Sequence, residues 1–170
     1  MSDSQEFESL LEQHWGIVRK VAGVYARTRD EREDLAQEIC LQLWRSFARY
    51  DRARPFATWM YRVALNTGIS SARRSRLNSA DDVSLEQVPA TSGGEPSDDR
   101  VEELYRFIHG QDELTRGLVL LYLEDRPHRE IAEILGISET NVSTRLSRFR
   151  ELARRTLAET NSAKGDSHNE

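Results

Sequence analysis

The stretch over residues 127–157 constrains what this 170-residue chain can fold into more than any other. Ile131 and Leu135 lie one helical turn apart, which predicts a short helix with an apolar face. Gly136 follows, and glycine permits the left-handed backbone that a tight turn requires. Ser138 then stands where its hydroxyl can cap the first N–H groups of another helix. The stretch therefore predicts two helices joined by a tight turn.

The second of these helices has one apolar and one polar face. Its apolar positions recur at helical spacing: Val142, Leu146, Phe149 and Leu152. The opposite face carries an amide, hydroxyls and arginines: Asn141, Ser143, Thr144, Arg145, Ser147, Arg148 and Arg150. Such groups can contact base edges and phosphates in the major groove of DNA. We interpret the stretch as a helix-turn-helix with residues 139–150 as the recognition helix. The plainer alternative is a helical hairpin with a solvated arginine face.

The net charge of −5 is unexpected for a chain that binds DNA, so the distribution of charge matters. Residues 76–98 contain Arg76 against five acidic side chains, whereas five arginines lie within residues 145–155. A local basic face can bind DNA in an acidic protein, but overall acidity weakens non-specific attraction. The composition therefore argues against a protein that binds DNA tightly by itself.

The remaining composition disfavours several classes of protein. Cys40 is the only cysteine, which excludes an internal disulfide and a multi-cysteine metal site, and no two of the four histidines stand at ligand spacing. No phosphate loop, nucleophile elbow or pair of catalytic carboxylates is present, so we expect neither an enzyme nor a cofactor. No apolar run is long enough to span a membrane, and the N-terminus lacks signal-peptide character. We therefore expect a cytoplasmic protein without membrane insertion.

The first half of the chain predicts three helices. Residues 7–28 have apolar side chains close to one face, and residues 28–32 form a charged connection. Residues 34–50 carry an apolar stripe: Ala36, Ile39, Cys40, Leu43, Trp44 and Phe47. Cys40 lies inside that stripe, so we interpret it as a small core residue. Three polar side chains lie off it and are most simply a solvated face: Asp34, Gln37 and Glu38.

The third predicted helix covers residues 56–76 and mixes aromatic, basic and amide side chains. Tyr61 falls on its apolar face, and the other members of the mixture are Trp59, Arg62, Asn66, Arg73 and Arg74. Aromatic rings can stack on bases while cations contact the backbone of single-stranded nucleic acid. Trp59 is equally consistent with a core residue.

A change of composition divides the chain into two parts. Residues 77–98 are rich in Ser, Asp, Gly, Pro and Ala without helical periodicity, which predicts an acidic flexible linker. The linker separates a domain over residues 1–76 from a four-helix domain over residues 99–160, and residues 161–170 read as a disordered tail. No strand pattern appears, so we predict an all-α fold of two small helical domains.

The order of these pieces resembles the extracytoplasmic-function (ECF) sigma factors, the small two-domain branch of the sigma-70 family. The resemblance spans most of residues 7–157. The segments that carry it are DLAQE at 34–38, FATWMYRVALN at 56–66, ARR at 72–74, IAEILGIS at 131–138 and the helix at 142–150.

The resemblance implies a role for each predicted surface. Asp34, Gln37 and Glu38 would contact a coiled coil of the largest subunit of core RNA polymerase. The segment over residues 56–66 would recognise and melt the −10 element of promoter DNA, with Trp59 and Tyr61 shaping the helix or its pocket. Asn66 would lie near a flipped base, and the phosphate contacts would be Arg62, Arg73 and Arg74.

The same resemblance assigns the helix-turn-helix to the −35 element. Its base or backbone contacts would be Ser143, Thr144, Ser147 and Arg148 on the face that also carries Asn141, and its phosphate contacts would be Arg145 and Arg150. An anti-sigma factor is a further partner that is common in the family. The chain departs from the family pattern at Ser70, where aspartate is frequent, and at Ser143, where a basic residue is frequent. These departures concern the promoter sequence rather than the role.

Three alternatives remain at this point. A stand-alone regulator would use the helix-turn-helix on operator DNA, but it would leave the aromatic and basic helix at residues 56–76 unexplained and would normally dimerise. A sigma-like interaction module would bind partners without initiating transcription. An enzyme is disfavoured because no catalytic motif is present.

Overall fold

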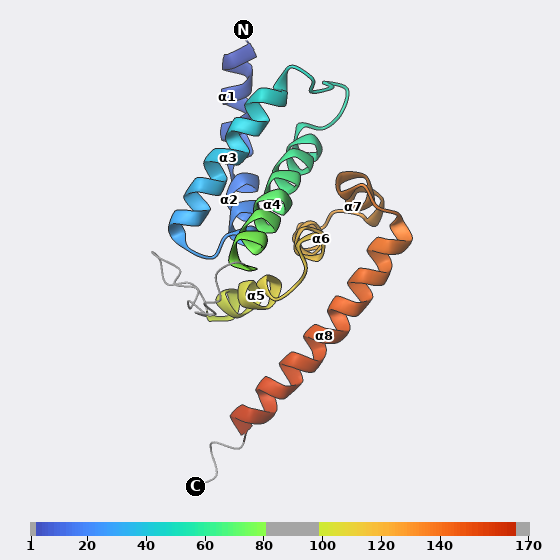
Figure 1. Ribbon diagram of the computed structural model, residues 1–170. Coiled ribbons are helices and arrows are strands. Elements are labelled where there is room, and N and C mark those ends of the chain that lie inside the picture. Colours follow the sequence, from blue (N-terminus) through green and yellow to red (C-terminus); the bar gives the residue numbers. More distant parts are fainter. Residues whose placement is uncertain (1–2, 81–98, 166–170) are drawn as a thin grey trace.

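The computed structural model describes residues 3–80 and 99–165, and all regular structure in these ranges is helical. The first unit comprises α1 (Asp3–Gln13), α2 (Trp15–Tyr25), α3 (Arg29–Phe47) and α4 (Phe56–Ala80). The second unit comprises α5 (Asp99–His109), α6 (Glu113–Leu123), α7 (His128–Leu135) and α8 (Glu139–Gly165). Figure 1 shows the two groups side by side, and the all-α prediction is confirmed.

Local hydrogen bonds explain where the first helices begin and end. The helix predicted over residues 7–28 is two helices, interrupted at His14. The helix predicted from residue 34 begins five residues earlier, because Thr28 and Glu31 form a capping box. The Thr28 hydroxyl accepts from the Glu31 N–H at 3.2 Å, and the Glu31 carboxylate accepts from the Thr28 N–H at 3.0 Å. The charged connection predicted over residues 28–32 is therefore the first turn of α3.

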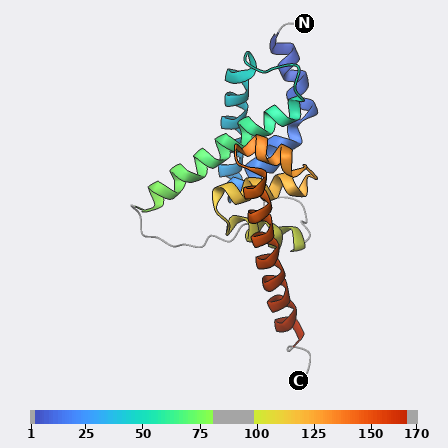
Figure 2. The ribbon, with the colours of Figure 1, turned by 90° about the vertical axis from the view of Figure 1, so that its right-hand side faces the viewer.

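Two helices extend beyond their predicted ends. Helix α4 continues through Ala80, over the first four residues of the stretch that we assigned to the linker. Helix α8 continues through Gly165, into the stretch that we expected to be a disordered tail. The rest of the linker, residues 81–98, and residues 166–170 lie outside the described residues. In Figure 2 the C-terminal part of α8 extends away from the other helices.

Helix α2 lies at the centre of the described residues, and each residue from Ile17 to Tyr25 except Arg19 and Lys20 is buried. It contacts α3 and α4 of its own unit and α5 and α6 of the second unit. Leu43 and Met60 contribute fully buried side chains from α3 and α4, and Leu118 does so from α6. Burial of large apolar side chains of this kind is the main favourable term in folding.

Two residues that the sequence placed in the core are exposed. Trp44 was predicted to face inward from α3 but is 46% exposed, and Leu35 occupies the buried position on that helix instead. Leu152 was predicted to face inward from α8 but is 44% exposed.

The two units pack against each other around Tyr25. This residue is 8% exposed, and its hydroxyl donates to the Glu113 carbonyl of α6 at 2.7 Å. The ring fits between two glycines, Gly68 of α4 and Gly117 of α6. A Cβ at position 117 would lie 2.8 Å from the Tyr25 hydroxyl, and a Cβ at position 68 would overlap the ring. The close approach of α6 to α2 and α4 therefore depends on glycine at both positions.

Candidate polymerase and nucleic-acid interfaces

Helix α3 presents the residues predicted to bind polymerase on its outer surface. Asp34 and Gln37 are exposed, whereas Glu38 is half-buried. Its carboxylate accepts from the Arg74 guanidinium of α4 at 2.8 and 3.0 Å. The structure thus joins a residue predicted to bind polymerase to a residue predicted to bind promoter DNA. The pair fixes α4 against α3 at this level of the bundle.

The exposed surface of α3 continues into two apolar side chains that the sequence interpretation did not assign to it. Leu41 is 45% exposed, close to the value for Trp44. Residues 34, 37, 41 and 44 follow helical spacing and share one face. The Trp44 ring contacts the Phe7 ring of α1 at 5.2 Å between centroids. Asp34 and Gln37 therefore form the polar half of one candidate docking surface, and Leu41 and Trp44 form its apolar half. The helical spacing of Leu41 and Trp44 from Asp34 was the sequence signal that could have assigned them to this surface.

Helix α4 exposes one row of the residues predicted to bind the −10 element. Arg62, Asn66 and Arg73 are exposed, and so is Ser70 between them. The spacing of three to four residues places the four side chains along one face of α4. The row presents two cations, an amide and a hydroxyl, which are groups that bind phosphates and base edges.

Trp59 belongs to an aromatic cluster at the beginning of α4. Its ring lies 5.1 Å from Tyr50 and 5.3 Å from Phe56, measured between centroids. The ring also meets Phe47 of α3 edge-on at 6.2 Å. The side chain is half-buried, so it packs in this cluster while part of it remains accessible. Both interpretations of Trp59 that the sequence left open, as core and as a platform, are compatible with this position.

Tyr61 lies apart from the exposed row and faces the second unit. It is 1% exposed, its hydroxyl donates to the Glu124 carboxylate at 3.3 Å, and the Arg126 guanidinium lies 5.2 Å from its ring centroid. Burial and the adjacent Glu124 raise the pKa of the Tyr61 hydroxyl to about 12. In this arrangement the second unit covers one of the side chains predicted to act at the −10 element.

Further polar contacts between the units share one pattern of charge. The first unit supplies cations or hydroxyl groups, and the second unit supplies the carboxylates of α6 and α7 or the residues next to them. The pairs are Lys20 with Glu124 at 2.7 Å, Thr58 with Glu130 at 2.8 Å, Arg76 with Glu113 at 2.9 Å, and Arg54 with Glu133. Most of these groups are partly exposed, so each pair contributes little by itself, about 0–1 kcal/mol. Acidic side chains of the second unit therefore lie against α2, against the start of α4 and the loop before it, and against Arg76 beyond the exposed row.

The structure confirms the two local features predicted for the helix-turn-helix, the turn at Gly136 and the helix cap at Ser138. Gly136 has φ 67° and ψ 34°, the left-handed conformation, and its N–H donates to the Ala132 carbonyl. The Ser138 hydroxyl accepts from the Asn141 N–H at 3.1 Å at the start of α8. Val142 and Leu146 are fully buried against the rest of the second unit. The turn and the cap hold α8 with its polar side chains outward.

Two of the arginines predicted to contact phosphates bind α6 or its N-cap instead of pointing freely into solvent. The Arg145 Nη1 donates to the Asp112 carboxylate at 3.2 and 3.3 Å and to the Thr115 hydroxyl at 3.0 Å. The Arg150 Nη2 donates to the Tyr122 hydroxyl at 2.8 Å, and its guanidinium lies 4.8 Å from that ring centroid. Both contacts fasten α8 to α6.

The rest of the polar face of α8 is exposed. Its members are Asn141, Ser143, Thr144, Ser147 and Arg148. The Asn141 side chain accepts from Arg145 at 3.0 Å, and the Ser143 hydroxyl lies 3.2 Å from the His128 ring. Thr144, Ser147 and Arg148 follow one another at spacings of three and one residues and form the centre of this face. A flat, exposed row of small polar groups beside an arginine can enter a major groove.

Within residues 3–80 and 99–165, no cluster of His, Cys, Asp or Glu has the arrangement of a metal site. None of the described helices combines the length and the apolar character that crossing a membrane requires.

Two families match the sequence, and together they cover both units. Residues 10–77 match "Sigma-70 region 2", and residues 112–152 match "Sigma-70, region 4". The first match includes the exposed faces of α3 and α4. The second includes the turn at Gly136 and the exposed polar face of α8.

Curated relatives are similar over most of their length. The ECF RNA polymerase sigma factor SigW of Bacillus subtilis is 30% identical over 141 residues, which cover 75% of each chain. The ECF RNA polymerase sigma-E factor of Haemophilus influenzae is 26% identical over 166 residues, covering 88% of this chain and 86% of the relative.

Solved structures share the fold. CnrH, in complex with the cytosolic domain of CnrY, superposes with a TM-score of 0.66 at 19% identity and covers 92% of this chain and 90% of its own. The sigma factor RpoE of Bartonella quintana, in complex with the anti-sigma factor NepR, superposes with a TM-score of 0.67 at 19% identity, over 91% of this chain and 96% of its own.

Proposed function

Because the chain belongs to the ECF sigma factors of the sigma-70 family, we propose that its three exposed faces divide the work of transcription initiation among them. The chain is an RNA polymerase sigma factor. The exposed face of α3 binds core polymerase, the exposed row of α4 binds the −10 element, and the polar face of α8 binds the −35 element. A solitary helix-turn-helix regulator does not account for the match over residues 10–77.

The observation that carries this proposal is the continuous row on α4, which lies next to the docking surface of α3. Arg62 and Arg73 are placed to neutralise phosphates, and Asn66 between them is placed to bond a base edge. Trp59 supports a pocket for an unstacked base from the half-buried aromatic cluster. On α3, Asp34, Gln37 and Glu38 form the polar half of the polymerase surface, and Leu41 with Trp44 adds an apolar half.

Two groups of residues on α8 have different roles. One group contacts DNA, and the other fastens α8 to α6. Thr144, Ser147 and Arg148 contact bases or the backbone of the −35 element, and Asn141 and Ser143 border them. Arg145 and Arg150 act first as braces, because their guanidinium groups already bind groups at or near α6. The protein works without catalysis of its own and in the cytoplasm, where RNA polymerase is found. The domains follow the two units, with residues 81–98 between them and residues 166–170 after the second.

The packed arrangement described above is the resting form in this proposal. Tyr61 and Thr58 of α4 face promoter DNA only after α6 and α7 have moved away, because Glu124 and Glu130 now bond to them. Binding to polymerase separates the units, and the two promoter elements are then read by different units. The solved complexes of CnrH and RpoE contain bound partners, and we propose that an anti-sigma factor likewise holds this chain in its resting form.

In vitro run-off transcription tests the proposal. Purified protein and core polymerase should produce defined transcripts from a promoter library, whereas the protein alone should bind the same duplexes weakly. The row of α4 is tested by the double variant Arg62→Ala and Asn66→Ala, which should lose promoter opening but retain polymerase. The variant Arg49→Ala, which changes an exposed arginine outside the three faces, is the control. Absence of any specific start site with the wild-type protein contradicts the proposal.

A further inference from the structure

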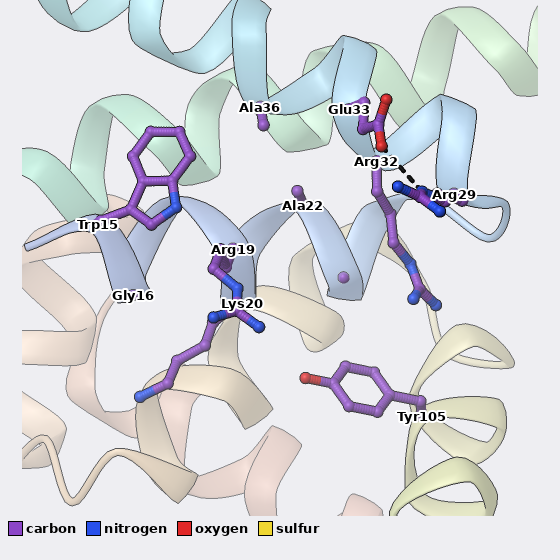
Figure 3. Close-up of a pocket in the computed structure, with 11 residues that line it drawn as sticks. Trp15, Gly16, Arg19, Lys20, Ala22, Arg29, Arg32, Glu33, Ala36 and Tyr105 are labelled. Carbon is purple, nitrogen blue, oxygen red and sulfur yellow. Dashed lines mark hydrogen bonds and ion pairs between the residues drawn. The ribbon is translucent and has the colours of Figure 1, made fainter. Parts of the chain in front are cut away.

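Helix α5 of the second unit rests on α2 of the first through two side chains one helical turn apart, Tyr105 and His109. The Tyr105 ring packs at Gly23, where an added Cβ would lie 3.4 Å from the Tyr105 Cε1. The His109 Nε2 lies 3.1 Å from the carbonyl oxygen of the same glycine. Figure 3 shows Tyr105 across from Ala22 of α2, with Arg32 extending from α3 toward α5. Both side chains of α5 therefore meet α2 at a single residue.

The end of α2 leaves the Gly23 carbonyl available to His109. The helix ends at Tyr25, and the Arg27 N–H, which would bond Gly23 in a longer helix, donates instead to the Glu31 carboxylate at 2.8 Å. A carbonyl oxygen can only accept, so the bond requires the proton of the neutral ring to lie on Nε2. Nδ1 is then the unprotonated nitrogen.

The second nitrogen of the ring lies in a site that disfavours a proton. His109 is 6% exposed, and its Nδ1 is buried without a hydrogen-bond partner among the residues that the structure describes. The surrounding charges are positive: Arg116 of α6 donates to the His109 backbone carbonyl at 2.8 Å, and Arg27 and Arg32 lie on the other side of the interface. A proton on Nδ1 would add a buried charge beside these cations and a donor without an acceptor.

The carboxylates at the start of the neighbouring helices are already bound to other groups. At the start of α6, Asp112 binds Arg145 and Glu113 binds Arg76. At the start of α3, Glu31 accepts from the backbone and caps the helix. These carboxylates can compensate a charged imidazole only by giving up their present partners. The contact between α5 and α2 therefore depends on a neutral ring.

We propose that protonation of His109 detaches α5 from α2, so that mild acidification releases the protein from its resting form. The inference rests on the proposed function, in which the packed arrangement is the resting form. Nδ1 takes up a proton from solvent while Nε2 keeps its own, and the charged ring is hydrated once α5 has separated from α2. The two units then remain folded and are joined by the residues between them.

The proton affinity of the ring determines the direction and the size of the effect. Burial together with Arg116, Arg27 and Arg32 lowers the pKa of His109 to about 4 in the packed form, and the bond to Gly23 offsets this only in part. The ordinary value is 6.5. Between these values the separated form binds more protons, so a falling pH favours it. From about pH 7.5 to 5.5 the ratio of separated to packed protein should rise by about tenfold.

Other titrating groups do not produce a change in this range of pH. Carboxylates have ordinary pKa values near 4, so the ion pairs between the units stay charged above about pH 5.5. His14 contacts the Phe56 ring within the first unit, and His128 lies beside Ser143 within the second. Neither of these contacts crosses between the units. An expansion between about pH 7.5 and 5.5 therefore reports on His109.

Small-angle scattering of the full chain tests the proposal. The radius of gyration of the wild type should increase reversibly from about pH 7.5 to 5.5, with unchanged helical content by circular dichroism. His109→Gln is the matched variant, because its amide can donate to Gly23 but cannot take up a proton. It should keep one radius of gyration at both pH values. A wild type that stays compact, or an equal expansion of His109→Gln, would overturn the proposal.

A second measurement uses the wild type alone and decides the matter if His109→Gln is already expanded at pH 7.5. The ring of His109 is titrated by NMR, and its midpoint is compared with the midpoint of the expansion. The two midpoints should coincide, and the neutral ring should carry its proton on Nε2. A ring that becomes charged without expansion, or an expansion that precedes the charge, contradicts the mechanism.

Polymerase assays separate this inference from the proposed function. Relative to His109→Gln, the wild type should gain about threefold in affinity for core polymerase from about pH 7.5 to 6, because more of it is separated. A wild type that directs transcription at pH 7.5 but neither expands nor gains affinity in acid refutes the role of His109 alone. An inactive wild type at pH 7.5 refutes the proposed function, whatever the scattering shows.

Discussion

Tyr25 shows how single glycines decide whether the units can pack. Its ring occupies the space that side chains at Gly68 and Gly117 would need, and its hydroxyl bonds to the α6 backbone. Burial raises the pKa of this hydroxyl, which therefore stays protonated and continues to donate at every physiological pH. The contact is neutral and buried, unlike the ion pairs around it, so salt should weaken it little.

We expect Gly68→Ala to destabilise the protein by about 1–3 kcal/mol, because the added Cβ would overlap the buried Tyr25 ring. Gly16→Ala is the matched control: its Cβ would meet nothing within 4 Å, and alanine is the better helix former. Urea unfolding followed by circular dichroism measures both changes. If Gly68→Ala were as stable as Gly16→Ala, the ring would not be confined as described.

Arg145 and Arg148 provide a second comparison at single residues. Arg145→Ala removes hydrogen bonds to Asp112 and Thr115, so we expect a loss of about 1–2 kcal/mol in unfolding free energy. Arg148→Ala removes an exposed side chain, so stability should hardly change, but transcription from a −35-dependent promoter should fall by about tenfold. Thermal melts and run-off assays of both variants measure the difference. A destabilised Arg148→Ala, or a fully stable Arg145→Ala, contradicts the assignment.

His109 makes stability depend on pH in the acidic range. The ring is buried with Nε2 3.1 Å from the Gly23 carbonyl, and burial together with Arg116 and Arg27 lowers its pKa to about 4. In the unfolded chain the pKa returns to 6.5, so between these values the unfolded state binds more protons. Stability should therefore fall as pH decreases from 6.5 toward 4, and be insensitive to this group above 6.5. Urea midpoints across that range should fall less steeply for His109→Gln, and identical slopes would exclude the effect.

At the scale of the helices, α3 has a well-defined first turn and a candidate docking surface that is polar in one half and apolar in the other. The capping box at Thr28 and Glu31 fixes the first turn, and hydrogen bonds from the backbone N–H groups of Thr28 and Arg27 hold the pKa of Glu31 below its usual value. From that start the helical repeat brings Asp34, Gln37, Leu41 and Trp44 to one side. A rigid helix start thus sets the direction of the proposed polymerase contacts.

The double variant Asp34→Ala and Gln37→Ala should bind core polymerase about tenfold more weakly or worse, with unchanged helical content. Trp44→Ala should add to that loss, because an exposed tryptophan beside polar groups is the usual composition of an interface centre. Glu12→Ala, which removes an exposed carboxylate of α1, is the control. Affinity for core polymerase can be measured by competition with a labelled sigma factor. Unchanged affinity of the double variant would remove the polymerase assignment from α3.

Helix ends were predictable where the signal was local. Gly136 and Ser138 specified the turn and the cap of α8 because each acts on its own backbone neighbours. Thr28 and Glu31 carried an equally local signal, yet the apolar stripe from Ala36 onward pointed to a later start. Trp44 shows the limit of the stripe, since helical spacing gives the relative positions of side chains but not which side the neighbouring helices cover.

At the scale of the whole molecule, contacts between residues far apart in the sequence determine the surroundings of the candidate site residues. The helical periodicity of the sequence does not predict such contacts. Tyr61 was placed correctly on an apolar face, but that face is completed by Glu124 and Arg126, more than sixty residues further along the chain. In the same way, Arg145 and Arg148 look alike in the sequence and differ only because Asp112 lies beside one of them. The positions of the candidate residues were predictable, whereas the partners that occupy them came from the packing of the units.

We expect Glu124→Ala to shift the protein toward separated units, because this carboxylate bonds both Lys20 and Tyr61. Each contact is worth about 0–1 kcal/mol, so losing both should lower the ratio of packed to separated protein by up to about thirtyfold. The radius of gyration from small-angle scattering should increase, and transcription at limiting protein should rise. Glu12→Ala makes the same change of charge on the exposed surface of α1 and should do neither. A compact Glu124→Ala protein with wild-type output would exclude this carboxylate as a restraint.

The burial of Tyr61 has a consequence for how such a protein can diverge. The Tyr61 ring is proposed to act at promoter DNA, and the same ring is part of the contact with the second unit that buries it. A substitution selected for a new target sequence would also alter how easily the regulator is released. Promoter selectivity and the ease with which the two units separate therefore cannot evolve independently at this position. A substitution that changes one of them also changes the other.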